Sequence, residues 1–349
     1  MPERVMVTGA TGFVGSHLVE FLLKQTNAQV YAAQRRRSDT SLPEHAGRVQ
    51  WLEMDVTDAH NVLSAVKTVR PTHIFHLAAQ SFVPTSWTSP VETLTINAIG
   101  TVNILEALKT LELDTKMHIA GSSEEYGRVE PHELPISETN PLRPLSPYGV
   151  SKVAADLAGQ QYYCSYGLNV VITRAFNHTG PGRGEVFVES NFCKQIAAIE
   201  QRCQEPVISV GNLEAKRDFS DVRDIVRAYW LALERGQPGE VYNVCSGNIL
   251  SIQQILDALL PMSTVGDIRV EPDPDRLRPS DVLRLQGDSA KFRRETGWRP
   301  EIAIEQTWRD LLIYWRSRMT GAGVSTVTAR PRRGVAETRM QPARKPAKP

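Results

Sequence analysis

Tyr148 and Lys152 are the residue pair in this 349-residue chain whose types and spacing most directly suggest acid–base chemistry. The segment after Pro147 is compatible with a helix, in which a separation of four residues is about one turn and places both side chains on one face. A nearby ammonium group stabilises phenolate, so we expect the pKa of Tyr148 to be lowered toward neutrality, as general acid or base catalysis requires. A surface pair of the same spacing is the alternative.

A glycine-rich loop follows the first expected strand directly and leads into an amphipathic segment that ends near Lys24. Its G-x-x-G-x-x-G pattern permits a tight turn, and the N–H groups at the start of a helix attract a pyrophosphate. The alternative is a glycine turn that binds nothing. Because strand, turn and helix fall where the motif requires, we predict that a dinucleotide binds here. The residues concerned are Gly9, Thr11, Gly12, Phe13, Val14 and Gly15.

The ends of the next strands indicate which dinucleotide binds. Arg35 and Arg36 follow the second expected strand, where an acidic residue would bind the ribose of NAD, and guanidinium groups suit a 2′-phosphate. The sequence therefore predicts NADP as cofactor, with NADPH preferred over NADH; a solvated basic turn is the alternative. Further cofactor contacts are expected at Asp55, Val56, Leu77, Ala78, Ala79 and Asn97. Asp55 is placed to accept from an adenine amino group, whereas Asn97 has the alternative of bonding neighbouring backbone.

Short apolar runs alternate with longer amphipathic segments in the first half of the chain, which is typical of βαβ units around a parallel sheet. The expected strands are 5–7, 29–33, 49–52, 73–77, 117–120 and 170–173. We predict an α/β fold with a Rossmann-type, doubly wound sheet over residues 1–175 and a smaller α+β substrate lobe over 176–318. Residues of about 212–250 are expected to return to the sheet domain, and a helix is expected at 304–316.

The composition is that of an ordinary globular protein, with 41% hydrophobic and 23% charged residues and a formal net charge of +1. We expect neither a membrane nor a nucleic acid as partner. The widely spaced Cys164, Cys193, Cys203 and Cys245 argue against a zinc site or a disulfide framework, so we expect no metal and a cytoplasmic location. Residues 320–349 carry seven Lys or Arg against one acid without apolar periodicity, which predicts a disordered basic tail; an anionic contact is the alternative.

The glycine loop, Ser122 with Ser123 after the fifth strand, and the Tyr148 and Lys152 pair together resemble the extended short-chain dehydrogenase/reductase family, over about residues 1–318. The resemblance implies that Ser122 holds the substrate oxygen, that Tyr148 transfers its proton, and that Lys152 tunes Tyr148 and binds the nicotinamide ribose. It also implies a C-terminal lobe that binds a nucleotide sugar, and a homodimer formed through helices near 91–111 and 147–165.

Four motifs narrow the resemblance to the GDP-mannose branch: GSSEEYG at 121–127, FNHTGPG at 176–182, GNLEAKRD at 211–218 and LRPSD at 277–281. The implied substrate is a GDP-sugar, whose diphosphate suits guanidinium and ammonium groups. Substrate contacts are expected from Ser122, Asn177, Lys194, Arg217 and Arg278. A surface ion pair, or for Asn177 a turn cap, would explain each alone. His178 is expected to pack or bond near the nicotinamide rather than act as a base.

Within this branch the motifs are most similar to the GDP-4-dehydro-6-deoxymannose reductases. This implies NAD(P)H-dependent reduction of the C4 ketone of GDP-4-dehydro-6-deoxy-D-mannose to a GDP-6-deoxyhexose of the GDP-rhamnose type. The alternative is GDP-mannose 4,6-dehydratase, which needs a carboxylate to remove the C5 proton, and Glu124 stands at that position. Glu125, where the dehydratases have an apolar residue, and FNHTGPG in place of N-H-E-S-P favour the reductase. A non-catalytic nucleotide sensor is disfavoured because the whole catalytic set is present.

Overall fold

The computed structural model describes residues 3–35, 47–276 and 284–321. Its largest sheet has the strands β1 (Arg4–Thr8), β2 (Gln29–Gln34), β3 (Val49–Glu53), β4 (His73–His76), β5 (Lys116–Ser122), β6 (Val170–Ala175) and β10 (Val241–Val244). Their order is β10-β6-β5-β4-β1-β2-β3, and every neighbouring pair is parallel. The order reverses between β1 and β4, which confirms the predicted doubly wound Rossmann-type fold.

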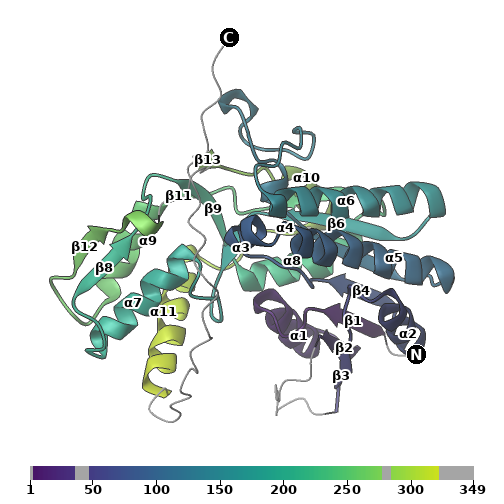
Figure 1. Cartoon of the computed structure of the whole chain (residues 1–349), viewed down its shortest axis with the longest axis horizontal. Coiled ribbons are helices and arrows are strands. Elements are labelled where there is room, and N and C mark those ends of the chain that lie inside the picture. Colours follow the sequence, from purple (N-terminus) through teal and green to yellow (C-terminus); the bar gives the residue numbers. More distant parts are fainter. Residues whose placement is uncertain (1–2, 36–46, 277–283, 322–349) are drawn as a thin grey trace, which may run out of the picture.

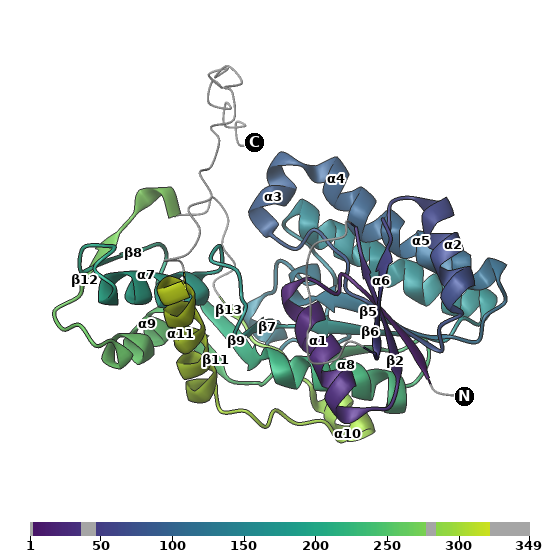
Figure 2. The same ribbon diagram turned by 90° about the horizontal axis from the view of Figure 1, so that it is seen from below.

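Helices cover both faces of this sheet (Figures 1 and 2); they are α1 (Phe13–Gln25), α2 (Ala59–Val69), α5 (Gly100–Thr110), α6 (Pro147–Tyr166), α8 (Val222–Arg235) and α10 (Ala290–Thr296). Successive side chains of a strand point to opposite faces. Val5 and Val7 therefore enter a core with α1, α8 and α10, whereas Met6 enters a second core with α2, α5 and α6. Burial of both faces explains why the strands consist of continuous apolar runs.

Short helical pieces link the larger elements near the carboxyl edge of the sheet. α3 (Val83–Thr88), α4 (Pro90–Leu94) and the π-helical turn η2 (Thr95–Ile99) lead into α5. The 3-10 turn η3 (Ser123–Glu125) follows β5 directly, and η4 (Pro131–Glu133) comes after it. Two of the residues that the sequence predicts for the site lie on these pieces, Asn97 on η2 and Glu124 on η3.

A smaller body lies beside the sheet, at the left of Figures 1 and 2. Its strands are β7 (Asn177–Thr179), β8 (Val207–Val210), β9 (Lys216–Asp221), β11 (Ile249–Ser251), β12 (Arg269–Pro272) and β13 (Arg284–Leu285). Its helical elements are α7 (Val188–Glu200), α9 (Ile252–Leu259), η5 (Leu260–Met262), η6 (Pro274–Arg276) and α11 (Ile304–Gly321). β9 pairs with β7, β11 and β13, and β8 pairs with β12. A separate core around Phe192, Ile208 and Trp308 supports this body.

Residues 212–250 do not return to the large sheet as one block. β10 pairs with β6, and α8 packs in the same core as α1, but β9 and β11 on either side of them belong to the smaller body. The crossing is abrupt because Asp221, the last residue of β9, is also the N-cap of α8 and accepts the backbone N–H of Arg223 at 2.8 Å.

α11 extends to Gly321 and so includes the first residues of the segment predicted to be disordered. The rest of that tail, 322–349, lies outside the described residues. In the described part of the chain, no helix has the length and apolar character that crossing a membrane requires, and no group of three or more His, Cys, Asp or Glu is arranged to hold a metal ion.

Candidate active site

The predicted phosphate loop joins β1 to α1 at the point where the strand order reverses. Gly9 has a φ of +67°, and a Cβ atom there would lie 2.8 Å from the backbone nitrogen of Ala78. A Cβ atom on Gly15 would lie 2.2 Å from the carbonyl oxygen of Gly9. No side chain of the described residues caps α1 at Gly12, so its first N–H groups remain for an anion. The loop therefore fits a dinucleotide pyrophosphate.

The end of β4 lies directly against this loop. Thr8 Oγ1 accepts the backbone N–H groups of Leu77 and Ala78, both at 3.1 Å. Leu77, Ala78 and Ala79 are half-buried, and the two alanines have the smallest side chains that a strand end can offer beside glycine. These contacts leave the backbone close to the path that a cofactor follows from the loop across the sheet edge.

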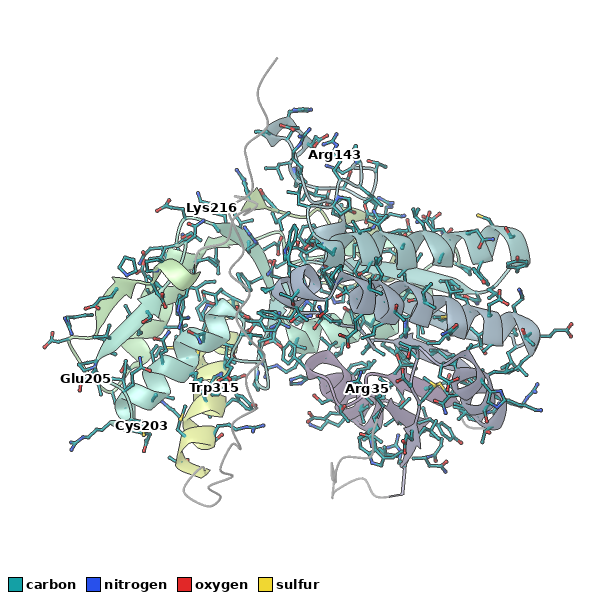
Figure 3. All side chains as sticks on the ribbon, in the orientation of Figure 1. Arg35, Arg143, Cys203, Glu205, Lys216 and Trp315 are labelled. Carbon is teal, nitrogen blue, oxygen red and sulfur yellow. The ribbon has the colours of Figure 1, made fainter. Side chains whose placement is uncertain are left out.

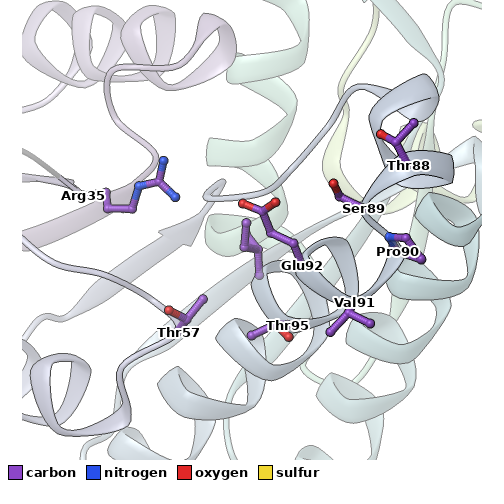
Figure 4. A pocket seen from close by; sticks show the side chains of 9 residues that line it. Arg35, Thr57, Thr88, Ser89, Pro90, Val91, Glu92 and Thr95 are labelled. Carbon is purple, nitrogen blue, oxygen red and sulfur yellow. The ribbon is translucent and has the colours of Figure 1, made fainter. Parts of the chain in front are cut away.

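A cavity of about 570 Å³ lies between the ends of β2 and β3 and the α4–η2 segment (Figure 4). Arg35 and Thr57 line one side, and Glu92 and Ile96 line the other. Thr57 donates its backbone N–H and its hydroxyl to Asp55 Oδ1, at 2.9 and 2.7 Å. The backbone bond from Thr57, with a smaller contribution from Arg35, lowers the pKa of Asp55. Asp55 is thus held ionised as a hydrogen-bond acceptor beside the cavity.

Arg35 is exposed at this cavity, and Figure 4 shows its guanidinium and the Glu92 carboxylate pointing toward each other across it. Its predicted companion Arg36 lies outside the described residues. Val56 is buried, and its carbonyl accepts from Asn103 Nδ2 at 2.8 Å. The cavity is where the adenosine end of a cofactor would lie if the phosphate loop holds its pyrophosphate.

Asn97 is placed differently from the cofactor contact that the sequence predicts. Its Oδ1 accepts the backbone N–H of Gln80 at 2.8 Å, and its Nδ2 donates to the Gln80 carbonyl at 3.0 Å and to Ser151 Oγ at 2.8 Å. The side chain is buried and its hydrogen-bonding groups are engaged by the protein. This geometry favours the alternative in which Asn97 fixes neighbouring backbone, here between β4, η2 and α6.

The structure brings the predicted catalytic residues together where β5 meets α6. A Cβ atom on Gly149 would lie 2.7 Å from the carbonyl oxygen of Glu124, so the first turn of α6 packs directly on η3. Ser122, the N-cap of η3, therefore lies near Tyr148, and its hydroxyl acts on the pKa of the phenol. Lys152, one turn along α6, donates to the Ala120 carbonyl at 2.9 Å. Its Nζ is 5.9 Å from the centroid of the Tyr148 ring.

The expectation of a lowered Tyr148 pKa is wrong for this structure. Tyr148 and Lys152 are each only 8% exposed. Burial raises the pKa of Tyr148, and the charge of Glu124 adds to this, while the hydrogen bond from Ser122 and the charge of Arg183 act in the opposite direction. Burial also lowers the pKa of Lys152 to about 8. At neutral pH, the phenol therefore keeps its proton and Lys152 is still mainly charged.

His178 lies beside the phosphate loop, with its ring stacked on Phe13 at 6.2 Å between centroids. Burial, more than the charge of Arg183, lowers the pKa of His178 to about 4. Its Nδ1 is 2.9 Å from the carbonyl oxygen of Phe176, so Nδ1 carries the hydrogen and Nε2 is an acceptor. His178 is therefore a neutral, packed histidine beside the phosphate loop, and its nearness to a nicotinamide stays a prediction.

Arg183 is a site residue that the sequence analysis missed. Its guanidinium lies 3.3 Å from the ring centroid of Phe187 and 5.1 Å from that of Phe13, and its Nε is 3.6 Å from Glu189. Burial lowers the pKa of Arg183, and its charge acts on Tyr148. The sequence contains a sign that Arg183 belongs to the site, because this residue directly follows the FNHTGPG motif.

Ser122 lies on β5, and the other predicted substrate residues in the described part of the chain lie on the smaller body. A cavity of about 450 Å³ beside α7 and β8 is lined by Lys194, Arg276 and Glu205, among others. Lys194 forms an ion pair with Glu185, and Arg276 Nη1 donates to Asn191 Oδ1 at 2.7 Å. Figure 3 shows Glu205 and Trp315 on this body and Arg35 on the other.

The other predicted substrate residues do not line this cavity in the described part of the chain. Asn177 lies on β7 opposite Phe219, and Arg217 lies on β9, where its Nη1 donates to the Lys216 carbonyl at 3.0 Å. Arg278 lies outside the described residues. The structure therefore brings Lys194 together with Arg276, a residue that the sequence analysis did not single out.

The sequence matches the model of the GDP-mannose 4,6 dehydratase family over residues 6–311. The chain belongs to this family. A GDP-6-deoxy-D-mannose reductase from Pseudomonas aeruginosa is 35% identical over 91% of this chain and 99% of its own length. A GDP-mannose 4,6-dehydratase from Vibrio cholerae is 32% identical over 90% of this chain and 94% of its own. A solved structure of RMD from Pseudomonas aeruginosa complexed with NADPH has a TM-score of 0.80 and 34% identity, and covers 90% of this chain and 99% of the other.

Membership of the GDP-mannose 4,6 dehydratase family confirms the resemblance that the sequence motifs predict. The match runs through both bodies of the structure, from β1 into α11. Reductases and dehydratases both occur among the relatives at similar identity, so the choice between the two reactions depends on the residues of the site.

Proposed function

We propose that the protein is an NADPH-dependent reductase that converts the C4 ketone of GDP-4-dehydro-6-deoxy-D-mannose into the alcohol of a GDP-6-deoxyhexose of the GDP-rhamnose type. The observation that carries this choice is the FNHTGPG motif at 176–182, which stands where the dehydratases resemble N-H-E-S-P. Reduction needs a phenol that holds its proton until the hydride arrives, whereas a dehydratase begins by removing a proton from a C4 hydroxyl. Burial raises the pKa of Tyr148, which agrees with a phenol that is protonated before the hydride arrives.

Each member of the catalytic set has a distinct task in this reaction. Bound NADPH supplies the hydride that is added to C4. Ser122 donates a hydrogen bond to O4 as negative charge develops there, and Tyr148 gives its proton to the same atom. Lys152 stabilises the phenolate that remains. The cofactor is held by the phosphate loop, the Leu77 to Ala79 strand end and the cavity beside Arg35; the NADPH in the similar Pseudomonas aeruginosa structure supports this choice of cofactor.

The large sheet holds the cofactor in this proposal, and the smaller body binds the GDP part of the substrate. Lys194 and Arg276 offer positive charge at the cavity beside α7, and Glu205 offers a carboxylate to the N–H donors of a guanine base. Asn177 and Arg217 are the further predicted contacts, on β7 and β9. The GDP-sugar names of the relatives support this substrate class.

The deciding experiment supplies each candidate substrate separately to purified protein. With GDP-4-dehydro-6-deoxymannose, the protein should oxidise added NADPH in a one-to-one ratio, followed by absorbance at the nicotinamide band. With GDP-mannose alone, it should do nothing. Because a dehydratase regenerates its bound cofactor internally, conversion of GDP-mannose to the 4-keto sugar without net NADPH change would overturn the proposal.

GDP-mannose 4,6-dehydratase is the second candidate, and the observation that favours it is Glu124, whose charge acts on Tyr148. A dehydratase would use this carboxylate to remove the C5 proton. Glu124→Gln should then abolish dehydration, whereas a reductase should keep much of its rate. A non-catalytic nucleotide sensor would consume no cofactor with either sugar.

We also propose a homodimer formed through α4, η2 and α6. These elements pack together and expose apolar side chains at Val91, Ile99, Val150 and Leu157, with Val91 76% exposed. Large exposed apolar side chains gathered on elements that pack together are typical of an interaction site. A cytoplasmic location is supported by the four free cysteines, which a reducing compartment keeps as thiols.

A further inference from the structure

Glu125 is a fully buried carboxyl group behind the proposed catalytic serine, and no step described so far uses it. Its Oε1 accepts the backbone N–H of Ser122 at 2.7 Å. In return, Ser122 Oγ accepts the backbone N–H of Glu124 at 3.2 Å. These two bonds form a capping box at the start of η3, the arrangement that normally fixes the first turn of a helix. Here it fixes a turn that carries a predicted catalytic hydroxyl.

The capping box determines how the Ser122 hydroxyl can act. A hydroxyl oxygen that accepts the Glu124 N–H through a lone pair keeps its own hydrogen to donate elsewhere. Ser122 has an extended backbone, with φ −155° and ψ 147°, and its side chain is hydrogen-bonded to Tyr148. The capping box leaves this hydrogen unused, so it can turn from Tyr148 to a carbonyl oxygen that gains negative charge beside the proton donor.

A buried charge cluster holds the other side of the Glu125 carboxyl. Arg174 Nε donates to Asp156 Oδ2 at 2.8 Å and lies 3.2 Å from Glu125 Oε2. Since Nε carries one hydrogen, Oε2 has no N–H donor among the described residues. A protonated Glu125 whose O–H faces Asp156 satisfies this geometry, and burial raises the pKa of Glu125 well above its usual value.

The surrounding elements are shaped to receive this carboxyl group. A Cβ atom on Gly121 would lie 2.7 Å from Glu125 Oε1, so the strand has a glycine where Glu125 folds back onto it. Asp156 follows Lys152 by one turn of α6, and Arg174 lies on β6. The cluster thus connects β5, η3, α6 and β6 directly behind the catalytic set.

We propose that Glu125 is a positioning residue for the reduction: by binding the Ser122 N–H, it holds η3 so that the Ser122 hydroxyl donates to the C4 oxygen of the substrate. This inference rests on the proposed function, because it needs Ser122 to hold that oxygen. The apolar residue that the family resemblance implies at this position in dehydratases has no acceptor for the N–H. Glu125 therefore distinguishes the two enzyme types through the serine.

A double-mutant cycle on the full chain tests the proposal. Glu125→Leu should lower kcat for the keto sugar about tenfold, with KM and the Kd of NADPH unchanged. In a Ser122→Ala background, the same change should lower kcat less than about twofold, because the positioned hydroxyl is gone. Glu125→Gln keeps an oxygen for the Ser122 N–H and presents an NH₂ group to Asp156, so it should rescue kcat to within about threefold.

Tyr126→Phe is the matched control. It removes a hydroxyl that accepts from Arg174 at 3.1 Å and donates to Asn243 at 2.7 Å, in the same cluster but outside the capping box. Tyr126→Phe should lower the thermal unfolding midpoint. It should change kcat by the same factor with and without the Ser122 hydroxyl. If Glu125→Leu does not fold, Glu125→Asp replaces it, since the shorter side chain does not reach the Ser122 N–H.

Two results would overturn the proposal, and they can be told apart. An equal loss of kcat from Glu125→Leu with and without the Ser122 hydroxyl would overturn the positioning role alone. A Ser122→Ala variant with unchanged kcat would overturn it together with the role proposed for Ser122. In either case, the NADPH affinity and unfolding midpoint of each variant show whether the fold is intact.

Discussion

Tyr148 is the proposed proton donor. Burial raises the pKa of its phenol, so the phenol keeps its proton at neutral pH. We expect Tyr148→Phe to lower turnover about 10²-fold or more, the usual scale for loss of a general acid. NADPH binding should persist because the phosphate loop is untouched. Turnover is measured with stopped absorbance assays, and NADPH binding with a fluorescence titration. Tyr162→Phe, on the same helix, should keep near-normal turnover; if Tyr148→Phe does the same, the assignment is wrong.

Lys152 sets the expected alkaline limit of activity. Its pKa is lowered to about 8 by burial, so the ammonium is present below that pH and is lost as the pH rises through it. The phenol of Tyr148 has a raised pKa and titrates later. We therefore expect kcat/KM for NADPH, which reports ionisations of the free enzyme, to fall above about pH 8. A profile that stays flat to about pH 9.5 would contradict this.

At the residue scale, spacing predicts which side chains meet but not how their protons behave. Tyr148, Lys152 and Ser122 are found from one helical turn and one strand end, and the structure brings them together. The direction of the Tyr148 pKa shift could not be predicted, because it depends on how deeply α6 and η3 bury the phenol. The contacts of Glu125 could not be predicted for the same reason: the sequence marks it only as a difference from the dehydratases and gives no sign that it faces inward.

At the element scale, the loop between β1 and α1 requires glycine at certain positions, because other backbone atoms approach it closely. We expect Gly15→Ala to displace the start of α1, because its Cβ would lie 2.2 Å from the Gly9 carbonyl oxygen, a backbone atom that moves only with the loop. Overpacking of this kind costs about 1–3 kcal/mol.

The consequence of Gly15→Ala should be visible in binding as well as in stability. The Kd of NADPH should rise about tenfold or more, which corresponds to about 1.4 kcal/mol, while the thermal midpoint falls. Ser16→Ala, at the adjacent exposed position of α1, should change neither quantity. An unchanged NADPH Kd in Gly15→Ala would show that the close approach to Gly9 does not hold the loop in its binding conformation.

Apolar periodicity predicts most elements but not the sheet to which each belongs. The strand β10 at 241–244 pairs with β6, next to α8, which returns to the core of α1. β9 and β11, on either side of α8 and β10 in the chain, join the smaller body instead. The π-helical turn at Thr95–Ile99 has no sequence signature, and it turns Asn97 inward to Gln80 and Ser151.

At the scale of the whole molecule, aromatic side chains from the two bodies meet beside the catalytic set. Phe13 and Phe82 belong to the sheet body, and Phe187 and Arg183 precede α7 of the smaller one. Phe82 and Phe187 have ring centroids 5.9 Å apart, and Arg183 lies over both Phe13 and Phe187. The proposed hydride and proton transfers thus take place where the cofactor body and the substrate body are joined.

The proposed dimer gives the last prediction. Val150 and Leu157 are seven residues apart and therefore lie on one face of α6, where Leu157 is 51% exposed. A second copy of this face would bury both, and a carboxylate there would be taken out of water without a partner. Leu157→Glu should therefore convert the dimer to monomer in sedimentation velocity or light scattering. Ile313→Glu, at a slightly more exposed isoleucine of α11 (59%), should leave the dimer intact. If the unmodified protein sediments as a monomer, or if Leu157→Glu stays dimeric, this face is not the interface.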